Sequence, residues 1–139
     1  MGNKMEARIF PAQVNEIPPM LEFVCQQAES AGIHPKRIMH LQLAIEESAV
    51  NIASYAYEIP PGEILVRVEE DTKQFKVDLI DTGVPFDPLS VTEPDLEAGI
   101  DEREIGGLGI LFIRRVMDEV HYSRIEDKNI VSLVVYKAK

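Results

Sequence analysis

The segment EILVRVEEDTKQFKVDLID, residues 63–81, constrains the fold more than any other part of this chain. It contains two β-rich runs, residues 63–70 and 74–81, separated only by the sequence DTK. Strands joined this closely must lie antiparallel, because a parallel connection needs roughly a dozen residues or more. A second pair of runs, residues 121–126 and 130–137, is separated by DKN. We therefore predict two β-hairpins.

Helical periodicity fills much of the remaining chain. Residues 14–31 and 36–57 carry apolar side chains at spacings of three and four, and a further helix is predicted to follow the GGLG of residues 106–109. The predicted buried face of the second helix is Leu41, Ala44, Ile45, Ser48, Ala49 and Ile52, and that of the third is Ile113, Val116, Met117 and Val120. With a short strand at residues 7–12, this order predicts an α+β fold. We expect one domain, residues 1–139, a two-layer α/β sandwich with helices on one face of a mixed, mostly antiparallel sheet.

Composition limits the classes of function. The chain has 139 residues, 45% of them hydrophobic, and no apolar run that could span a membrane. Its formal net charge of −10 makes nucleic acid and anionic membranes poor direct partners. Cys25 is the single cysteine and no signal peptide is apparent, so we expect a cytoplasmic protein.

Acidic residues are concentrated in residues 87–105. This segment carries seven acids and one base, a net charge of −6 (1 − 7), and shows no clear period. Loops this long are more often functional lids than plain connections. We expect a lid that is mobile without a partner and turns its carboxylates outward; the alternative is a loop that is merely solvated.

One helix contains an acidic residue and an amide four positions apart. Because a helix advances about 100° per residue, Glu47 and Asn51 share one flank of the buried stripe, whereas Glu46 projects from the opposite flank. A solvated helix edge would explain the pair. Alternatively, Glu47 is a carboxylate base beside Asn51, whose amide oxygen is a ligand suited to Mg²⁺.

Two further polar segments lie near the ends of predicted elements. In DTGVPFDP, residues 81–88, Asp81 ends an apolar strand, where a carboxylate is costly unless it is paired. Gly83 permits a close backbone approach or a positive φ. The segment is either a plain turn or a buried carboxylate that accepts a hydrogen bond from a ligand amino group. The glycines of residues 106–109 are either a flexible helix entry or a phosphate-binding helix start.

These three segments, in this order, resemble the ATP-binding boxes of Bergerat-fold ATPases. The chain is most similar to the anti-sigma factor serine/threonine kinases of bacterial partner switching. LQLAIEESAVNIASYAY resembles the family's asparagine box, DTGVPFDP its first glycine box and GGLGILFIRRVMDEV its second. Pro85 replaces the second glycine that is frequent in the first of these glycine boxes.

The resemblance implies a role for each matching residue. Glu47 is implied to be the catalytic base and Asn51 the Mg²⁺ ligand. Asp81 is implied to accept from the adenine amino group, with Gly83 beside it. The triphosphate is implied to lie against Gly107, Leu108 and Gly109, with residues 87–105 as the ATP lid.

The implied function is an ATP- and Mg²⁺-dependent protein serine/threonine kinase that acts as an anti-sigma factor. It would phosphorylate a serine of an anti-sigma-factor antagonist and sequester a sigma factor. Relatives dimerise, which leaves a homodimer open. One alternative is an ATP-gated protein-binding regulator of partner switching without kinase activity. Another is an interaction domain that keeps only the fold, against which the intact set of site residues speaks.

Overall fold

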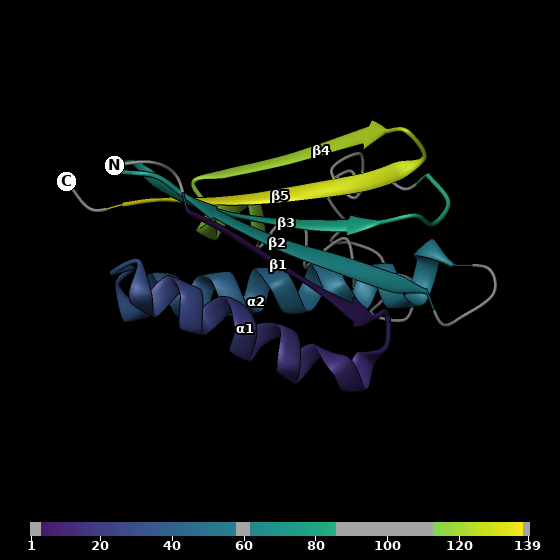
Figure 1. Cartoon of the computed structure of the whole chain (residues 1–139), viewed down its shortest axis with the longest axis horizontal. Coiled ribbons are helices and arrows are strands. Elements are labelled where there is room, and N and C mark those ends of the chain that lie inside the picture. Colours follow the sequence, from purple (N-terminus) through teal and green to yellow (C-terminus); the bar gives the residue numbers. More distant parts are fainter. Residues whose placement is uncertain (1–3, 58–61, 86–112, 138–139) are drawn as a thin grey trace, which may run out of the picture.

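The computed structural model describes residues 4–57, 62–85 and 113–137. Its two long helices lie side by side under one face of the sheet (Figure 1). The described elements are β1 (Lys4–Pro11), the 3-10 helix η1 (Val14–Glu16), α1 (Ile17–Ser30), α2 (Pro35–Asn51), the π-helix η2 (Ile52–Ala56), β2 (Glu63–Glu70), β3 (Gln74–Asp81), β4 (Glu119–Ile125) and β5 (Lys128–Tyr136). Residues 113–116 are also helical.

The sheet has five strands in the order β1-β2-β3-β5-β4. All four pairings are antiparallel, so the part of the sheet that is described contains no parallel pair, and the expected mixture of directions is absent there. The first predicted hairpin, β2 and β3, has the boundaries expected from the sequence. The predicted α+β two-layer sandwich is confirmed.

The core lies between the sheet and the helices. Every residue of the predicted stripe on α2 and η2 is buried, which confirms the periodicity argument. On the sheet side, alternate residues of the central strands face this stripe, because successive side chains of a strand point to opposite faces. They include Ile64, Val66, Val77, Leu79, Leu133 and Val135, all with 0% of their surface exposed. On α1, Met20, Val24 and Ala28 are fully buried, whereas Cys25 is only partly covered.

Several boundaries differ from the sequence prediction, among them that of the first strand, which is Lys4–Pro11 and not residues 7–12. Val120, expected on the third helix, belongs to β4. The second helix changes at Ile52 from α to π geometry, which broadens its last turn. The second hairpin turns through Glu126 and Asp127, since Ile125 pairs with Lys128, and not through DKN. Asn129 is therefore a strand residue of β5.

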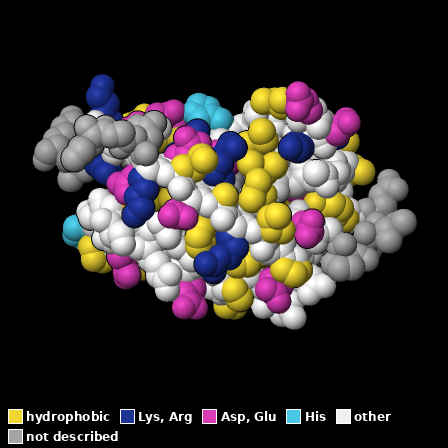
Figure 2. Space-filling view, viewed as in Figure 1, with side chains coloured by type: hydrophobic (Ala, Val, Ile, Leu, Met, Phe, Trp, Pro, Cys, Tyr) yellow, Lys and Arg dark blue, Asp and Glu magenta, His cyan; other side chains and the backbone are white. Residues whose placement is uncertain are grey.

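The other face of the sheet mixes apolar and charged side chains. The side of the molecule seen in Figure 2, on which both layers are visible, also carries a band of apolar side chains flanked by acidic and basic ones. The buried Asp78 accepts from Arg67 Nη2 at 2.8 Å and from Ser132 Oγ at 2.5 Å. These donors compensate the carboxylate for its loss of water.

Across residues 4–57, 62–85 and 113–137, no helix is long and apolar enough to cross a membrane.

The tight turn of the second hairpin generates a stability prediction. Glu126 and Asp127 have φ angles of 50° and 65°, the left-handed conformation that disfavours most L-residues. Asn-Gly suits such two-residue turns best. We expect the double variant Glu126→Asn/Asp127→Gly to raise the free energy of unfolding by about 1 kcal/mol, measured by urea denaturation. Unfolding at a lower urea concentration than wild type would contradict this account of the turn.

Candidate functional site

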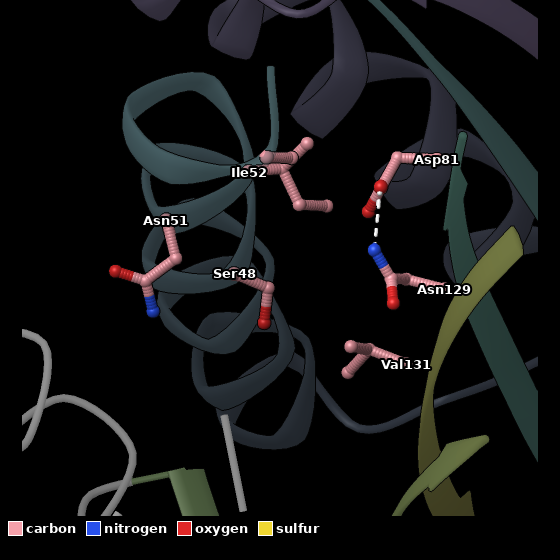
Figure 3. A pocket seen from close by; sticks show the side chains of 7 residues that line it. Ser48, Asn51, Ile52, Asp81, Asn129 and Val131 are labelled. Carbon is pink, nitrogen blue, oxygen red and sulfur yellow. Dashed lines mark hydrogen bonds between the residues drawn. The ribbon is translucent and has the colours of Figure 1, made fainter. Parts of the chain in front are cut away.

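The ends of β3 and β5 bring two buried polar side chains together. Asp81, the last residue of β3, lies opposite Asn129 in the register with β5. Their exposed fractions are 3% and 2%. Asn129 Nδ2 donates to Asp81 Oδ1 at 2.9 Å, as drawn in Figure 3. The expectation that Asp81 is a buried carboxylate is therefore confirmed, and its burial is compensated by hydrogen bonds, as a buried charge requires.

The carboxylate of Asp81 is fixed in orientation by its surroundings. A second donor to its Oδ1 atom is the backbone N–H of Gly83, at 2.9 Å. Asn129 is in turn held by Tyr122, whose hydroxyl donates to Asn129 Oδ1 at 2.6 Å, and it donates to the carbonyl of Val84 at 2.8 Å. Among the described residues these hydrogen bonds engage Oδ1 of Asp81 and leave Oδ2 to accept from a ligand.

A cavity opens between the C-terminal part of the second helix and this end of the sheet. It is lined by Ser48, Asn51, Ile52, Ala56, Asp81, Asn129 and Val131 (Figure 3). Its walls are thus largely apolar, with a few polar groups at defined positions, as is typical of small-molecule sites. The space measures about 20 Å³, which holds one water molecule. A flat aromatic ligand must therefore widen the cavity.

Position 83 requires glycine because the backbone of η2 approaches it closely. A Cβ atom at this position would lie 2.1 Å from the carbonyl oxygen of Ala56 in η2. The next amide, that of Val84, donates to the same oxygen at 2.7 Å. Arg124 Nη1 donates to the carbonyl of Gly83 at 2.8 Å. Of the two reasons considered from sequence, close approach applies, and it packs the turn after β3 against the end of the helix.

The Glu47 and Asn51 pair lies one helical turn apart on α2. Asn51 is 5% exposed and lines the cavity, and Glu47 is half-buried. Burial raises the pKa of the Glu47 carboxyl, a hydrogen bond to the Asn51 side chain opposes the rise, and the negative charge of Glu46 adds to it. In Figure 3 the Asn51 amide points away from Asp81. The side chains of Asn51 and Asp81 therefore serve different parts of the site.

The donor set of this pair fits a hard divalent cation. An ionised carboxylate only accepts hydrogen bonds, so the Glu47–Asn51 bond uses the amide N–H₂ of Asn51. The amide oxygen of Asn51 is then available to a cation. Mg²⁺ keeps several waters and needs few protein ligands. The described ranges contain no group of three or more His, Cys, Asp or Glu side chains that could hold a metal ion.

The described structure brings together four of the predicted site residues. Asp81 and Asn51 line one cavity, Gly83 contacts Asp81 through its backbone N–H, and Glu47 lies one helical turn from Asn51, whose side chain opposes the rise that burial causes in the pKa of Glu47. The remaining three, Gly107, Leu108 and Gly109, lie outside the described residues. So does the acidic segment 87–105, with the predicted orientation of its carboxylates.

Several residues that shape the site are not predicted from the sequence as site residues. The sequence predicts Asn129 in a turn, Tyr122 and Arg124 as strand residues, and Ser48 on the buried stripe. Register could have identified Asn129, because a hairpin turn that ends at Asp127, two residues earlier than predicted, makes Asn129 a residue of β5, where it lies opposite Asp81. Tyr57 is a further anchor: its hydroxyl donates to the carbonyl of Glu63 at 2.6 Å and accepts from Thr82 N at 3.1 Å.

Comparison with known proteins identifies similar sequences. Residues 10–135 match the histidine kinase-like ATPase domain family. The serine/threonine-protein kinase BtrW of Bordetella bronchiseptica is 26% identical over 99 residues, which cover 70% of this chain and 70% of the relative. The serine-protein kinases RsbW of Bacillus licheniformis and Listeria innocua are 28% and 31% identical, over 68% and 67% of this chain. The matched segment spans 62% of each of these two relatives.

The hydrogen bonds that Asn129 makes to Asp81 and Val84, here called the Asn129 junction, give the second prediction. Asn129→Ala removes the donor to Asp81 and to the carbonyl of Val84, so buried acceptors lose a partner. We expect a loss of about 1–3 kcal/mol in the free energy of unfolding, measured by urea denaturation. Tyr122→Phe removes only the hydroxyl next to Asn129 and should cost about 1 kcal/mol. Wild-type stability of Asn129→Ala would show that this junction does not hold the site.

Proposed function

The chain belongs to the histidine kinase-like ATPase domain family, and from this premise we propose that it is an ATP-dependent protein serine/threonine kinase acting as an anti-sigma factor. In this proposal it phosphorylates a serine of an anti-sigma-factor antagonist and sequesters a sigma factor. The observation that carries the proposal is the fixed carboxylate of Asp81 at a largely apolar cavity that Asn51 also lines. The protein kinase names of the similar sequences support it.

Adenine recognition is assigned to the sheet end of the site. Oδ2 of Asp81 accepts a hydrogen bond from the exocyclic amino group of the base. Ile52, Ala56 and Val131 supply apolar walls for the ring. A site built around such a buried hydrogen bond discriminates strongly against ligands that lack the donor. Gly107, Leu108 and Gly109 are proposed, from the family resemblance, to border the triphosphate.

Phosphoryl transfer is assigned to the helix side of the site. Asn51 would hold Mg²⁺ through its amide oxygen, and the ion would supply charge neutralisation at the phosphate oxygens. Glu47 takes the proton of the substrate serine hydroxyl, whose oxygen then accepts the γ-phosphoryl group while ADP leaves. Burial raises the pKa of Glu47, and a carboxylate with a raised pKa is the better proton acceptor near neutral pH.

Partners follow from the same proposal. The sigma factor and the antagonist are proteins, and the net charge of −10 makes nucleic acid a poor direct partner. We place the kinase in the cytoplasm, where these partners act, and a homodimer is compatible with the proposal. The second candidate function is an ATP-gated protein-binding regulator without transfer. Wild-type binding of Mg·ATP with no transfer to any cognate antagonist would favour that candidate.

The role of Glu47 gives the third prediction. We expect Glu47→Gln and Glu47→Ala to lose transfer of labelled γ-phosphate to a cognate antagonist by at least about a hundredfold, because they remove the base. Mg·ATP affinity, measured by isothermal titration, should stay within a few-fold of wild type. Normal transfer by Glu47→Ala would exclude Glu47 as the base.

Glu47→Gln also has a predicted effect on the free energy of unfolding. The pKa of Glu47 is higher in the folded state than in the unfolded state. Its protonated carboxyl therefore contributes to the free energy of unfolding below the unfolded-state pKa, and this stabilisation is lost as pH rises through the folded-state pKa. Glu47→Gln should therefore be at least as stable as wild type at pH 7, and its advantage should shrink in acid. Thermal unfolding at several pH values measures this difference.

Glu46 provides the fourth prediction, on pH dependence. Its negative charge raises the pKa of Glu47, so Glu46→Gln lowers that pKa. Because Glu47 acts ionised, the acidic limb of the pH profile of transfer should move to lower pH. The matched control is Glu22→Gln, an exposed residue of α1 that makes the same change in net charge. An identical shift in both variants would mean that the effect is not local to Glu47.

A further inference from the structure

Ser48 contributes an unexplained polar group to the cavity. Its side chain is 5% exposed, and Oγ has no hydrogen-bond partner among the described residues. It lines the same cavity as Asp81 and Asn129, and Figure 3 shows it on the side of α2 that faces β5. A buried hydroxyl without a partner costs stability, so each such group in a folded protein calls for a reason.

Packing does not supply that reason. The neighbours of Ser48 on the buried stripe, Ala44, Ala49 and Ile52, are all apolar. An alanine would fill the position without a polar atom, and it has a higher helix propensity. A serine within a helix usually bonds to the carbonyl one turn earlier, which Ser48 does not do. The hydroxyl is therefore free to bond to something that enters the cavity.

Asp81 and Ser48, two of the polar residues that line the cavity, differ in what they can offer a ligand. The ionised carboxylate of Asp81 only accepts, whereas the hydroxyl of Ser48 both donates and accepts. Adenine presents an amino donor next to a ring nitrogen that accepts. Guanine presents the opposite pattern, a carbonyl oxygen next to a ring N–H. A carboxylate opposite the exocyclic amino group selects adenine, because it would face the carbonyl oxygen of guanine, and the hydroxyl can donate to the adjacent ring nitrogen of adenine.

We propose that Ser48 is a base-binding residue that donates a hydrogen bond to the ring nitrogen N1 of adenine, directly or through one water. The inference rests on the proposed function, because it assumes that the cavity takes the base of ATP. Asn129 and Tyr122 support this recognition indirectly, since they hold Asp81 in the orientation that aligns the amino group.

The test is a titration of three nucleotides into wild type, Ser48→Ala and Ser54→Ala, in the presence of Mg²⁺. The nucleotides are ATP, GTP and 1-deaza-ATP, which carries a C–H in place of N1. We expect Ser48→Ala to weaken ATP about 3- to 10-fold and to leave 1-deaza-ATP unchanged, as loss of one hydrogen bond predicts. Ser48→Ala should still prefer ATP to GTP, because the acceptor-only carboxylate of Asp81 is unchanged. Ser54 is an exposed serine of η2, so Ser54→Ala should match wild type throughout.

Thermal unfolding without nucleotide separates recognition from folding. Removing an unpartnered hydroxyl should leave Ser48→Ala at least as stable as wild type, so a weaker affinity for ATP would not reflect a damaged fold. Equal affinity of Ser48→Ala and wild type for ATP would overturn the inference alone. Equal losses for ATP and 1-deaza-ATP would also overturn it. A wild-type protein that binds no ATP would overturn the proposed function and the inference together.

Discussion

The hydrogen bond between Asp81 and Asn129 connects the stability of the sheet to the geometry of the site. It exists only because β3 and β5 pair in the register that places these residues opposite each other. The same register puts Val77 opposite Leu133 and Leu79 opposite Val131 on the face that packs against the helices. A slip of one residue would turn every one of these side chains to the other face. The apolar core thus fixes the position of the carboxylate.

The positions of the site residues on α2 also depend on the apolar core. The buried stripe of α2 fixes the rotation of the helix, and this rotation places Ser48 and Asn51 at the cavity. The π-helix then brings the carbonyl of Ala56 to the turn after β3, where only glycine fits at position 83. Single-turn π-helices occur frequently at functional sites. Here the widened turn joins the end of the helix to the segment that orients Asp81.

Sequence reasoning predicted the layers, the first hairpin, the stripe of α2 and the buried state of Asp81, because all of these follow from local periodicity or from the cost of burying charge. It did not predict Asn129, because Glu126 and Asp127 lack the Asn-Gly signal of a tight turn. The change to π geometry at Ile52 leaves no mark on the apolar spacing. Nor can a sequence reveal that Ser48 lacks a partner, since this depends on what lies across the cavity.

These surprises share a physical character: each is a local choice that lowers stability. Residues Glu126 and Asp127 adopt left-handed backbone conformations, Ser48 buries a hydroxyl without a partner, and burial raises the pKa of Glu47. A sequence selected for stability alone would replace all three. Of these residues, Ser48 lines the cavity, and Glu47 lies one helical turn from Asn51, which also lines it. The turn at Glu126 and Asp127 sets the pairing of β4 with β5, which includes Asn129. Where several such costs converge on one cavity, recognition of a ligand is the simplest physical reason for retaining them.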